Sequence, residues 1–446
     1  MPAATYTNPI HPGDFADPFV LRFQGRYYAW GTGPAADGRF LPMLSSDDLV
    51  HWTEHGGALA PLDLPGAELY WAPEVAYSEG TFYLYYAVGR GDDPDHHLRL
   101  ATAPHPLGPW RDAGLNLAPH EIFAIDGHPF RDPADGLWYL FYARDRLEPP
   151  FAGTGVVVDR LLAMDRLEGK PREVRRPACD WMVFELQRAI KKGLDWYTAE
   201  GPFVLRPAET GGRYVCFYSG GRWEHPNYGV GYALADHPLG PWTDDVNTAG
   251  PQVLTTDPGR VIGPGHNSVV TGPDLLTPWI VYHAWNTGLT ARTPRIDRLA
   301  WQDGRPFVPG GPSTTPRPVP PGPDFHLRFE DQAPPAALPD LLGDFVAEAS
   351  VRWEREGPAL ALGSLEIGIA SGALQAGPAG APLPAGCDPS AWHTLHLRRQ
   401  AGKLTVTLDE YPTVQAHVPP GPQRLALPDL PGLGRVHLAL TRLRED

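Results

Sequence analysis

Cysteine is scarce in this sequence. Cys179, Cys216 and Cys387 are the three cysteines among 446 residues. They are too few for a disulfide framework, and their spacing fits no metal-binding motif. Because unpaired cysteine is one of the residue types most often buried, we expect three buried free thiols.

Long hydrophobic runs and an excess of positive charge are also lacking. No segment approaches the ~18 apolar residues of a membrane-spanning helix. The N-terminus, MPAATYTNPIHPGDFADPF, has neither the basic start nor the apolar core of a secretory signal, so we expect a cytoplasmic protein with no membrane association. The 37 lysines and arginines are outnumbered by 52 acidic residues, for a formal net charge of -15, which argues against nucleic acid as a partner. The sequence carries no signal about oligomeric state.

Chain breakers are abundant instead. The 53 prolines and 49 glycines are spread over a chain that is 42% hydrophobic. Such a chain can bury a core, but its breakers disfavour long helices. Its length allows two or three domains. We therefore expect an all-β protein of many short strands.

A short aromatic strand recurs five times, with bulky residues at its first and fourth positions. The hexapeptide His-Pro-Leu-Gly-Pro-Trp begins 23 residues after the start of two copies, at 105–110 and at 237–242. This regular phase predicts five equivalent units of about four strands, a five-bladed β-propeller. An irregular assembly of β-sandwiches is the alternative. The five copies occupy residues 27–30, 82–85, 138–141, 214–217 and 279–282.

A polar residue precedes each aromatic strand by eight to fourteen positions. In a propeller the first strand of each blade lines the central channel, so residues at matching phase converge at one mouth. Taken singly, each is better explained as part of an ordinary turn or loop. Together they predict a cluster of carboxylates with a histidine, which is costly unless used and suits glycosidic bond cleavage. The five residues are Asp17, Glu74, Asp126, Glu200 and His266.

The motifs around these residues resemble those of the family 43 glycoside hydrolases, five-bladed propellers that cleave arabinosyl and xylosyl linkages. The resemblance covers about residues 8–310. It includes 155–180, which is similar to the family's segment before the catalytic acid, and 296–306, which is similar to its closing blade. The motifs are Ala16-Asp17-Pro18-Phe19, Trp71-Ala72-Pro73-Glu74, Ile125-Asp126, Ala199-Glu200-Gly201-Pro202 and Gly263-Pro264-Gly265-His266-Asn267.

The resemblance implies a role for each site residue. Asp17 corresponds to the general base, Glu200 to the general acid, and Asp126 to the residue that orients the acid and raises its pKa by like-charge repulsion. The family inverts the anomeric carbon, with base and acid ~6.5–9.5 Å apart. The implied substrate-binding residues are Trp71, as a stacking or wall residue, Glu74, His266 and Arg292.

No cofactor is expected to be required. His266 matches a channel histidine that in some members holds a calcium or another ion, so it is a candidate ion ligand or water-holder, although the sequence defines no full coordination shell. One motif departs from the family. The modulator is commonly followed by proline, whereas Asp126 is followed by Gly127, which adds His128 as a neighbour of the site.

A proline-rich stretch divides the chain. Residues 311–324, GPSTTPRPVPPGPD, predict a stiff linker between a catalytic propeller at 1–310 and an accessory domain at 325–446. Alternating patterns there predict a small β-sandwich, which looks like the jelly roll appended to many family members. We expect it to cover one side of the active site. Carbohydrate binding is the alternative, although no aromatic row marks a binding face.

The sequence thus predicts an inverting glycoside hydrolase that releases α-L-arabinofuranosyl or β-D-xylosyl residues from an arabinose- or xylose-containing oligosaccharide. A cytoplasmic enzyme meets imported oligosaccharides, which favours exo action over an endo-acting arabinanase. A related phosphorylase or fructosidase is disfavoured because no basic cluster adjoins the motifs. A non-catalytic sugar-binding propeller is disfavoured because all three carboxylates are present.

Overall fold

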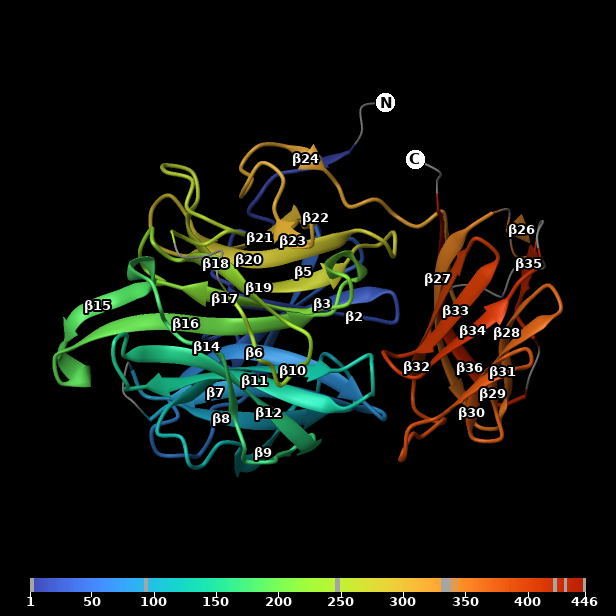
Figure 1. Ribbon diagram of the computed structural model, residues 1–446, viewed down its shortest axis with the longest axis horizontal. Coiled ribbons are helices and arrows are strands. Elements are labelled where there is room, and N and C mark those ends of the chain that lie inside the picture. Colours follow the sequence, from blue (N-terminus) through green and yellow to red (C-terminus); the bar gives the residue numbers. More distant parts are fainter. Residues whose placement is uncertain are drawn as a thin grey trace.

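The fold is all-β, as expected, and of the propeller type (Figure 1). The computed structural model describes residues 4–91, 95–244, 249–329, 338, 340–341, 343–419, 423–428 and 431–443. Within these ranges no helix is long and apolar enough to cross a membrane. The helical segments described are short 3-10 turns, η1 (Asp180–Met182), η2 (Ala189–Lys191) and η3 (Ala208–Thr210).

Two antiparallel four-stranded sheets begin the first part of the chain, and each follows sequence order. The first contains β2 (Ala16–Phe23), β3 (Arg26–Thr32), β4 (Phe40–Ser46) and β5 (Trp52–Leu59). The second contains β6 (Leu69–Ser78), β7 (Thr81–Gly89), β8 (His97–Ala103) and β9 (Arg111–Asn116).

The next two repeats are joined in one nine-stranded sheet, because β12 and β16 pair in parallel. A three-stranded sheet follows. The nine strands are β10 (Ala124–Arg131), β11 (Trp138–Arg146), β12 (Gly153–Ala163), β13 (Arg166–Leu167), β14 (Arg172–Arg175), β15 (Val183–Arg188), β16 (Leu194–Leu205), β17 (Tyr214–Gly220) and β18 (Gly229–Ala235). The three are β19 (Ile262–Thr271), β20 (Pro278–Trp285) and β21 (Arg292–Arg298).

The five aromatic segments form β3, β7, β11, β17 and β20, as the repeat predicts. Each pairs with the strand before it, and these first strands, β2, β6, β10, β16 and β19, carry the five polar residues. The two identical hexapeptides also adopt one structure. The Trp110 indole donates to the Pro106 carbonyl at 3.1 Å, and the Trp242 indole donates to the Pro238 carbonyl at 2.9 Å.

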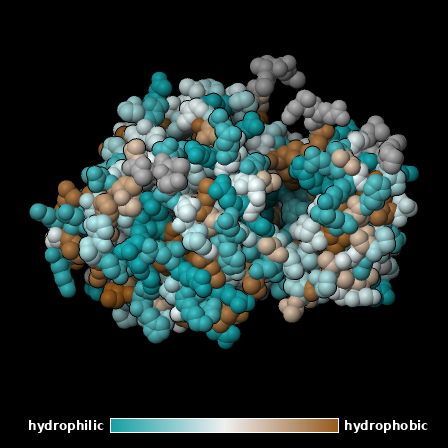
Figure 2. All heavy atoms as spheres, viewed as in Figure 1, coloured by the Kyte–Doolittle hydropathy of each residue, from teal (hydrophilic) through white to brown (hydrophobic). Residues whose placement is uncertain are grey.

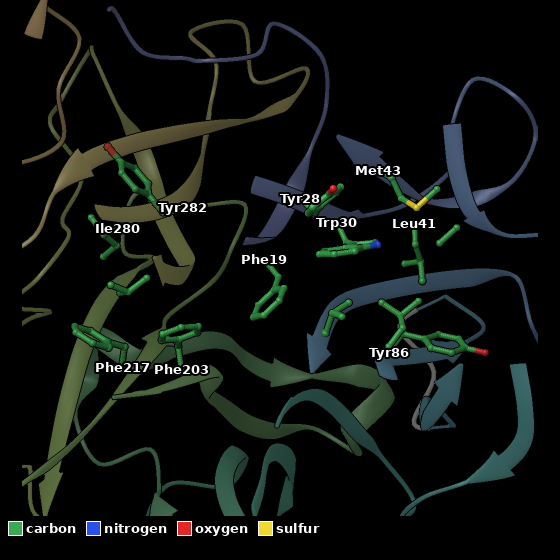
Figure 3. Close-up of a cluster of buried hydrophobic side chains, with 14 of the residues drawn as sticks. Phe19, Tyr28, Trp30, Leu41, Met43, Tyr86, Phe203, Phe217, Ile280 and Tyr282 are labelled. Carbon is green, nitrogen blue, oxygen red and sulfur yellow. The ribbon is translucent and has the colours of Figure 1, made fainter. Parts of the chain in front are cut away.

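Aromatic side chains from several sheets meet in one core (Figure 3). Phe19 lies 6.3 Å from Trp30 and 6.4 Å from Phe203, between ring centroids, so β2, β3 and β16 share this cluster. Burying each large ring contributes roughly 1.5–3 kcal/mol. The rings of β2 and β16 lie two or three residues beyond Asp17 and Glu200 on the same strands. Their packing therefore fixes the positions of the strands that carry the polar residues. Of the cysteines, Cys179 and Cys216 are buried as expected, whereas Cys387 is half-buried.

The C-terminal part consists of two six-stranded sheets that share a second core. The first contains β25 (Phe325–Arg328), β36 (Leu433–Arg442), β27 (Phe345–Trp353), β32 (His393–Gln400), β33 (Lys403–Leu408) and β34 (Thr413–His417). The second contains β26 (Asp340–Leu341), β35 (Gln423–Ala426), β28 (Gly357–Leu362), β29 (Leu365–Ala370), β30 (Ala373–Ala376) and β31 (Ala379–Pro382).

The proline-rich stretch is packed against the first part rather than extended freely. Its strand β24 (Arg317–Pro318) pairs with β1 (Thr5–Tyr6), and the buried Ser313 accepts a hydrogen bond from Asn8 at 3.0 Å. The hairpin β22 (Ala300–Gln302) and β23 (Arg305–Phe307) precedes it.

The C-terminal sheets contact the turns that end the first strands. The Asp388 N–H donates to Glu79 Oε2 at 2.6 Å, and the Arg328 guanidinium donates to the Gly25 carbonyl at 3.0 Å. These turns lie at the opposite end of the first strands from Asp17, the second residue of β2. The C-terminal sheets thus cover the end of the first strands opposite to Asp17, whereas the sequence predicted that they cover one side of the active site.

A buried ion pair joins the two parts. Glu348 of β27 pairs with Arg22 of β2 and accepts from His437 Nε2 at 3.0 Å. Removing one partner of a buried pair leaves an uncompensated charge. We therefore expect Glu348→Ala to lower the free energy of unfolding by ~3–5 kcal/mol, measured by denaturant titration, whereas Glu366→Ala at an exposed position of β29 changes it little. Equal stability of both variants would contradict a role for this pair.

Candidate active site

Each of the five first strands carries a β-bulge, where the register with the aromatic strand shifts. The bulges contain Asp17, Asp126 and His266 and lie directly beside Glu74 and Glu200. Within each bulge one residue adopts the left-handed conformation. For residues other than glycine this costs ~1–3 kcal/mol, and bulges beside active sites re-aim side chains. The left-handed residues are Asp17 (φ 50°), Ala72 (φ 44°), Asp126 (φ 58°), Gly201 (φ 56°) and His266 (φ 47°).

Side chains of the preceding repeat hold four of these bulges by accepting their backbone N–H groups. The remaining junction, between β6 and β10, is made by Glu74 and His128 Nδ1 at 2.5 Å. The five first strands are therefore linked in a closed cycle. The four backbone bonds run from Asp17 to His283 Nδ1 (3.0 Å), Ala72 to Thr32 Oγ1 (2.8 Å), Gly201 to Asp126 Oδ2 (2.9 Å) and His266 to Ser219 Oγ (2.7 Å).

Asp17 is a buried carboxylate surrounded by donors. Its Oδ1 accepts from Arg292 Nη1 at 3.2 Å, and its Oδ2 accepts from Thr32 Oγ1 at 2.5 Å. His266 Nδ1 lies 3.5 Å from the same Oδ1. Burial alone would raise the pKa of Asp17, but Arg292, His266 and His283 hold it well below its usual range. Asp17 is therefore ionised at neutral pH.

Glu200 and Asp126 have the opposite tendency. Burial, the largest cause, and the negative charge of Asp17 raise the pKa of Glu200 to about 7, against a hydrogen bond from the Tyr228 hydroxyl at 2.9 Å. Burial and the charges of Glu200 and Asp17 raise the pKa of Asp126 to about 7. These two groups titrate together. The site thus combines one ionised carboxylate with a pair that retains a proton near neutral pH.

Glu74 does not lie with these carboxylates. In β6 the residue with the left-handed conformation is Ala72, two positions before Glu74. Glu74 pairs with Tyr85 of the aromatic strand, and His128 pairs in the same way with Phe141 in the next sheet. Glu74 therefore corresponds in position to His128. Glu74 is therefore one layer deeper in the channel, where it is buried against His128. Its interpretation as a sugar contact is corrected to that of an inter-sheet link. His128, expected as a neighbour of Asp126, forms the other half of this link.

Trp71 and Arg292, the other expected residues, have aromatic neighbours. Trp71 stacks on His96 with 3.7 Å between ring centroids, which fits a wall residue. Arg292 lies over the Trp223 ring at 4.5 Å, and Trp223 stacks on Trp285 at 5.8 Å. This stacked group continues the site outward from Asp17.

Sequence reasoning missed several residues that hold the carboxylates. Three of them follow an aromatic strand segment by one or two positions: Thr32, Ser219 and His283. A polar residue just after the aromatic repeat could therefore have predicted them. Tyr228 and Trp223 come from the irregular stretch between β17 and β18 and have no repeat that would reveal them.

The fold is a propeller-type β fold, and its first strands bring an ionised carboxylate close to carboxyl groups that retain a proton. This combination of fold and site defines a glycoside hydrolase. The chain belongs to the family described as "Glycosyl hydrolases family 43", whose sequence model matches residues 6–306. The matched segment contains every residue of the site described above.

Named relatives agree with this family. The chain is 29% identical over 322 residues to the β-D-galactofuranosidase xynD of Aspergillus niger, covering 68% of this chain and 84% of the relative. It is 25% identical over 331 residues to the extracellular exo-α-(1→5)-L-arabinofuranosidase of Streptomyces avermitilis, covering 68% of this chain and 63% of the relative. Among solved structures, a thermostable family-43 glycoside hydrolase superposes with a TM-score of 0.60 at 33% identity, covering 71% of this chain and all of that one.

Proposed function

We propose that the protein is an inverting hydrolase that releases α-L-arabinofuranosyl or β-D-xylosyl residues from oligosaccharides. Asp17 acts as the general base that activates water, Glu200 as the general acid that protonates the leaving oxygen, and Asp126 as the positioning carboxylate that shares the acid's proton. The observation that carries this proposal is the divergence in pKa between Asp17 and the Glu200–Asp126 pair, since inversion needs one carboxylate of each kind.

In this mechanism each neighbour has a defined task. Arg292 and Thr32 hydrogen-bond to the Asp17 oxygens and keep the base ionised and oriented. Tyr228 orients Glu200, and Asp126 accepts the N–H of the next residue, Gly201. As the glycosidic bond breaks, the Glu200 proton passes to the leaving oxygen, while Asp17 takes a proton from the attacking water. We assign sugar contacts to Trp71, Arg292 and His266.

Of the two sugars, the arabinofuranosyl unit is favoured. Both relatives reported above carry names of furanosidases, and one is named as an exo-enzyme on an arabinosyl linkage. These names support a pocket for a five-membered ring at the end of a chain. An endo-acting arabinanase remains the second candidate.

We propose that the closed cycle of first strands is the centre of a five-bladed propeller at 1–310, followed by the linker 311–324 and a two-sheet β-sandwich at 325–446. The ring of bulge hydrogen bonds supports five blades, and the shared C-terminal core supports the sandwich. No cofactor is needed by the steps above. In the described residues the potential ligand groups close enough to share an ion are Glu79, Cys387 and His393. His266 is not among them; its role as an ion ligand or water-holder stays a prediction, and no step is derived through an ion.

Product analysis tests the proposal. The protein is incubated with α-1,5-arabino-oligosaccharides and, separately, β-1,4-xylo-oligosaccharides, and proton NMR follows the first anomer released. We expect arabinose of inverted configuration, taken from the chain end. A retained anomer would overturn the assignment of Asp17 as a base, and internal cleavage would favour the arabinanase.

The pH profile gives an independent test of the carboxylate pair. The acid must be protonated, so kcat/KM is expected to fall as pH rises through about 7, the pKa of Glu200. It is expected to persist on the acid side, because the pKa of Asp17 is held low. In Asp126→Asn the like charge beside Glu200 is lost, and we expect the basic limb to move to lower pH. An unmoved basic limb would contradict the coupling.

A further inference from the structure

A cavity lies between the C-terminal sheets and the ends of the first strands opposite to the carboxylates. It measures about 660 Å³, within the ~300–1,000 Å³ typical of small-molecule sites. The ends of the first strands bound it on one side, and β27, β32 and β33 bound it on the other. Figure 2 shows a recess between the two parts of the molecule. We call this space the far-end cavity.

The wall from the first part combines aromatic and aliphatic side chains with the arginines Arg22, Arg131 and Arg206. Phe23, Tyr77, Phe130 and Trp138 line it, and each is only partly buried. Phe23 and Tyr77 pack with 4.8 Å between ring centroids. Ring surface is therefore left facing the cavity instead of being covered by protein.

The opposite wall is polar. Alternate residues of β32 and β33 point away from the C-terminal core, so this wall presents hydroxyl, imidazole and guanidinium groups. A sheet whose task was only to seal an apolar channel end would oppose it with apolar side chains. This mismatch leaves the space unfilled. The polar residues are Thr394, His396, Arg398, Thr405 and Thr407.

Charge in the cavity is nearly balanced. Arg22 and Glu348 are paired with each other, and Arg131, Arg206 and Arg398 line the same cavity as Asp409 and Glu410. An anion would meet these carboxylates, a cation would meet the arginines, and an apolar ligand would leave the polar wall unsatisfied. A neutral ligand with apolar ring faces and hydroxyl edges satisfies both walls.

We propose that the far-end cavity binds a neutral oligosaccharide, with sugar faces on Phe23, Tyr77 and Trp138 and hydroxyls on β32 and β33. Its pentose type rests on the proposed function. Phe23 lies six residues beyond Asp17 on β2, roughly 20 Å at ~3.3 Å per residue. The lining also reaches inward to Phe19, His128 and Phe203, but it includes none of Asp17, Asp126 and Glu200. The cavity is therefore distinct from the active site and retains a glycan while another chain end is cleaved.

Calorimetric titration of the full chain carrying Glu200→Gln tests this, with arabinohexaose and xylohexaose as probes. We expect two equivalents of one probe to bind. Adding Arg398→Ala with Thr407→Val removes polar groups of the cavity, and Thr405→Leu separately fills it. Either change should reduce binding to one equivalent. Arg424→Ala, exposed on the other sheet, should leave two.

The outcomes separate this inference from the proposed function. One equivalent in every variant overturns the cavity site and leaves the active site intact, and no binding of either probe also overturns it. If the unaltered enzyme cleaves neither sugar but the cavity variants still lose a binding event, the cavity site stands and the proposed function fails. In the active enzyme, the cavity variants should retain kcat/KM on a short aryl glycoside.

Discussion

Glu200→Gln is expected to lower kcat on arabino-oligosaccharides by ~10²–10⁴-fold, the usual contribution of a general acid. Glutamine keeps the size of the side chain and can still accept from the Tyr228 hydroxyl, but it has no proton to give. On an aryl glycoside with an acidic phenol as leaving group the loss should be much smaller, because that oxygen needs little protonation. Steady-state kinetics on the two substrates measures this difference.

Glu209→Gln is the matched control. Glu209 is exposed in η3, shortly after the strand that carries Glu200, and its variant should behave as the unaltered enzyme on both substrates. Equal losses for Glu200→Gln on the oligosaccharide and the aryl glycoside would sink the assignment of Glu200 as the acid. Thermal unfolding of both variants distinguishes a chemical loss from misfolding.

Asp17→Asn should be as damaging, by ~10²–10⁴-fold, but without dependence on the leaving group. The base acts on water, so a better leaving oxygen does not replace it. The substitution also removes the charge that Arg292 pairs with and the charge that helps to raise the pKa of Glu200. The residual activity should therefore have its basic limb at lower pH.

Asp63→Asn, at an exposed position, serves as the control for this variant. Substantial activity of Asp17→Asn on either kind of substrate would show that another group activates water. A loss that is large only for the oligosaccharide would exchange the roles of Asp17 and Glu200. The two variants therefore need to be measured side by side on the same pair of substrates.

Much of the fold was predictable because its signal is local. Five aromatic segments read as strands and form β3, β7, β11, β17 and β20. Asp17, Asp126 and His266 fall in the bulges of the preceding strands and Glu200 lies directly beside one, because each strand runs antiparallel to an aromatic partner a short turn away. The union of two repeats through β12 and β16 was not predictable, since it depends on pairing between residues far apart in sequence.

The site shows the same division. Glu74 was assigned to the wrong layer because the bulge, which decides which residue faces the mouth, leaves no fixed offset in the sequence. In β6 that position is occupied by Ala72, whose side chain is unreactive. A search for reactive side chains therefore selected Glu74, two positions further along the strand. The pKa differences among Asp17, Asp126 and Glu200 arise from burial and from neighbours on other sheets, which no single strand encodes.

The cycle of hydrogen bonds through the bulges determines how this enzyme loses its activity. Four of the five bulges are held by the preceding repeat, the junction of β6 and β10 is made by Glu74 and His128, and the last repeat holds the first through His283 and Asp17. No subset of the sheets can therefore assemble a working centre, and a break at any junction releases strain around the whole circle. Inactivation by heat should then be all-or-none. We expect no partly active, partly opened species between the folded, active enzyme and the inactive one.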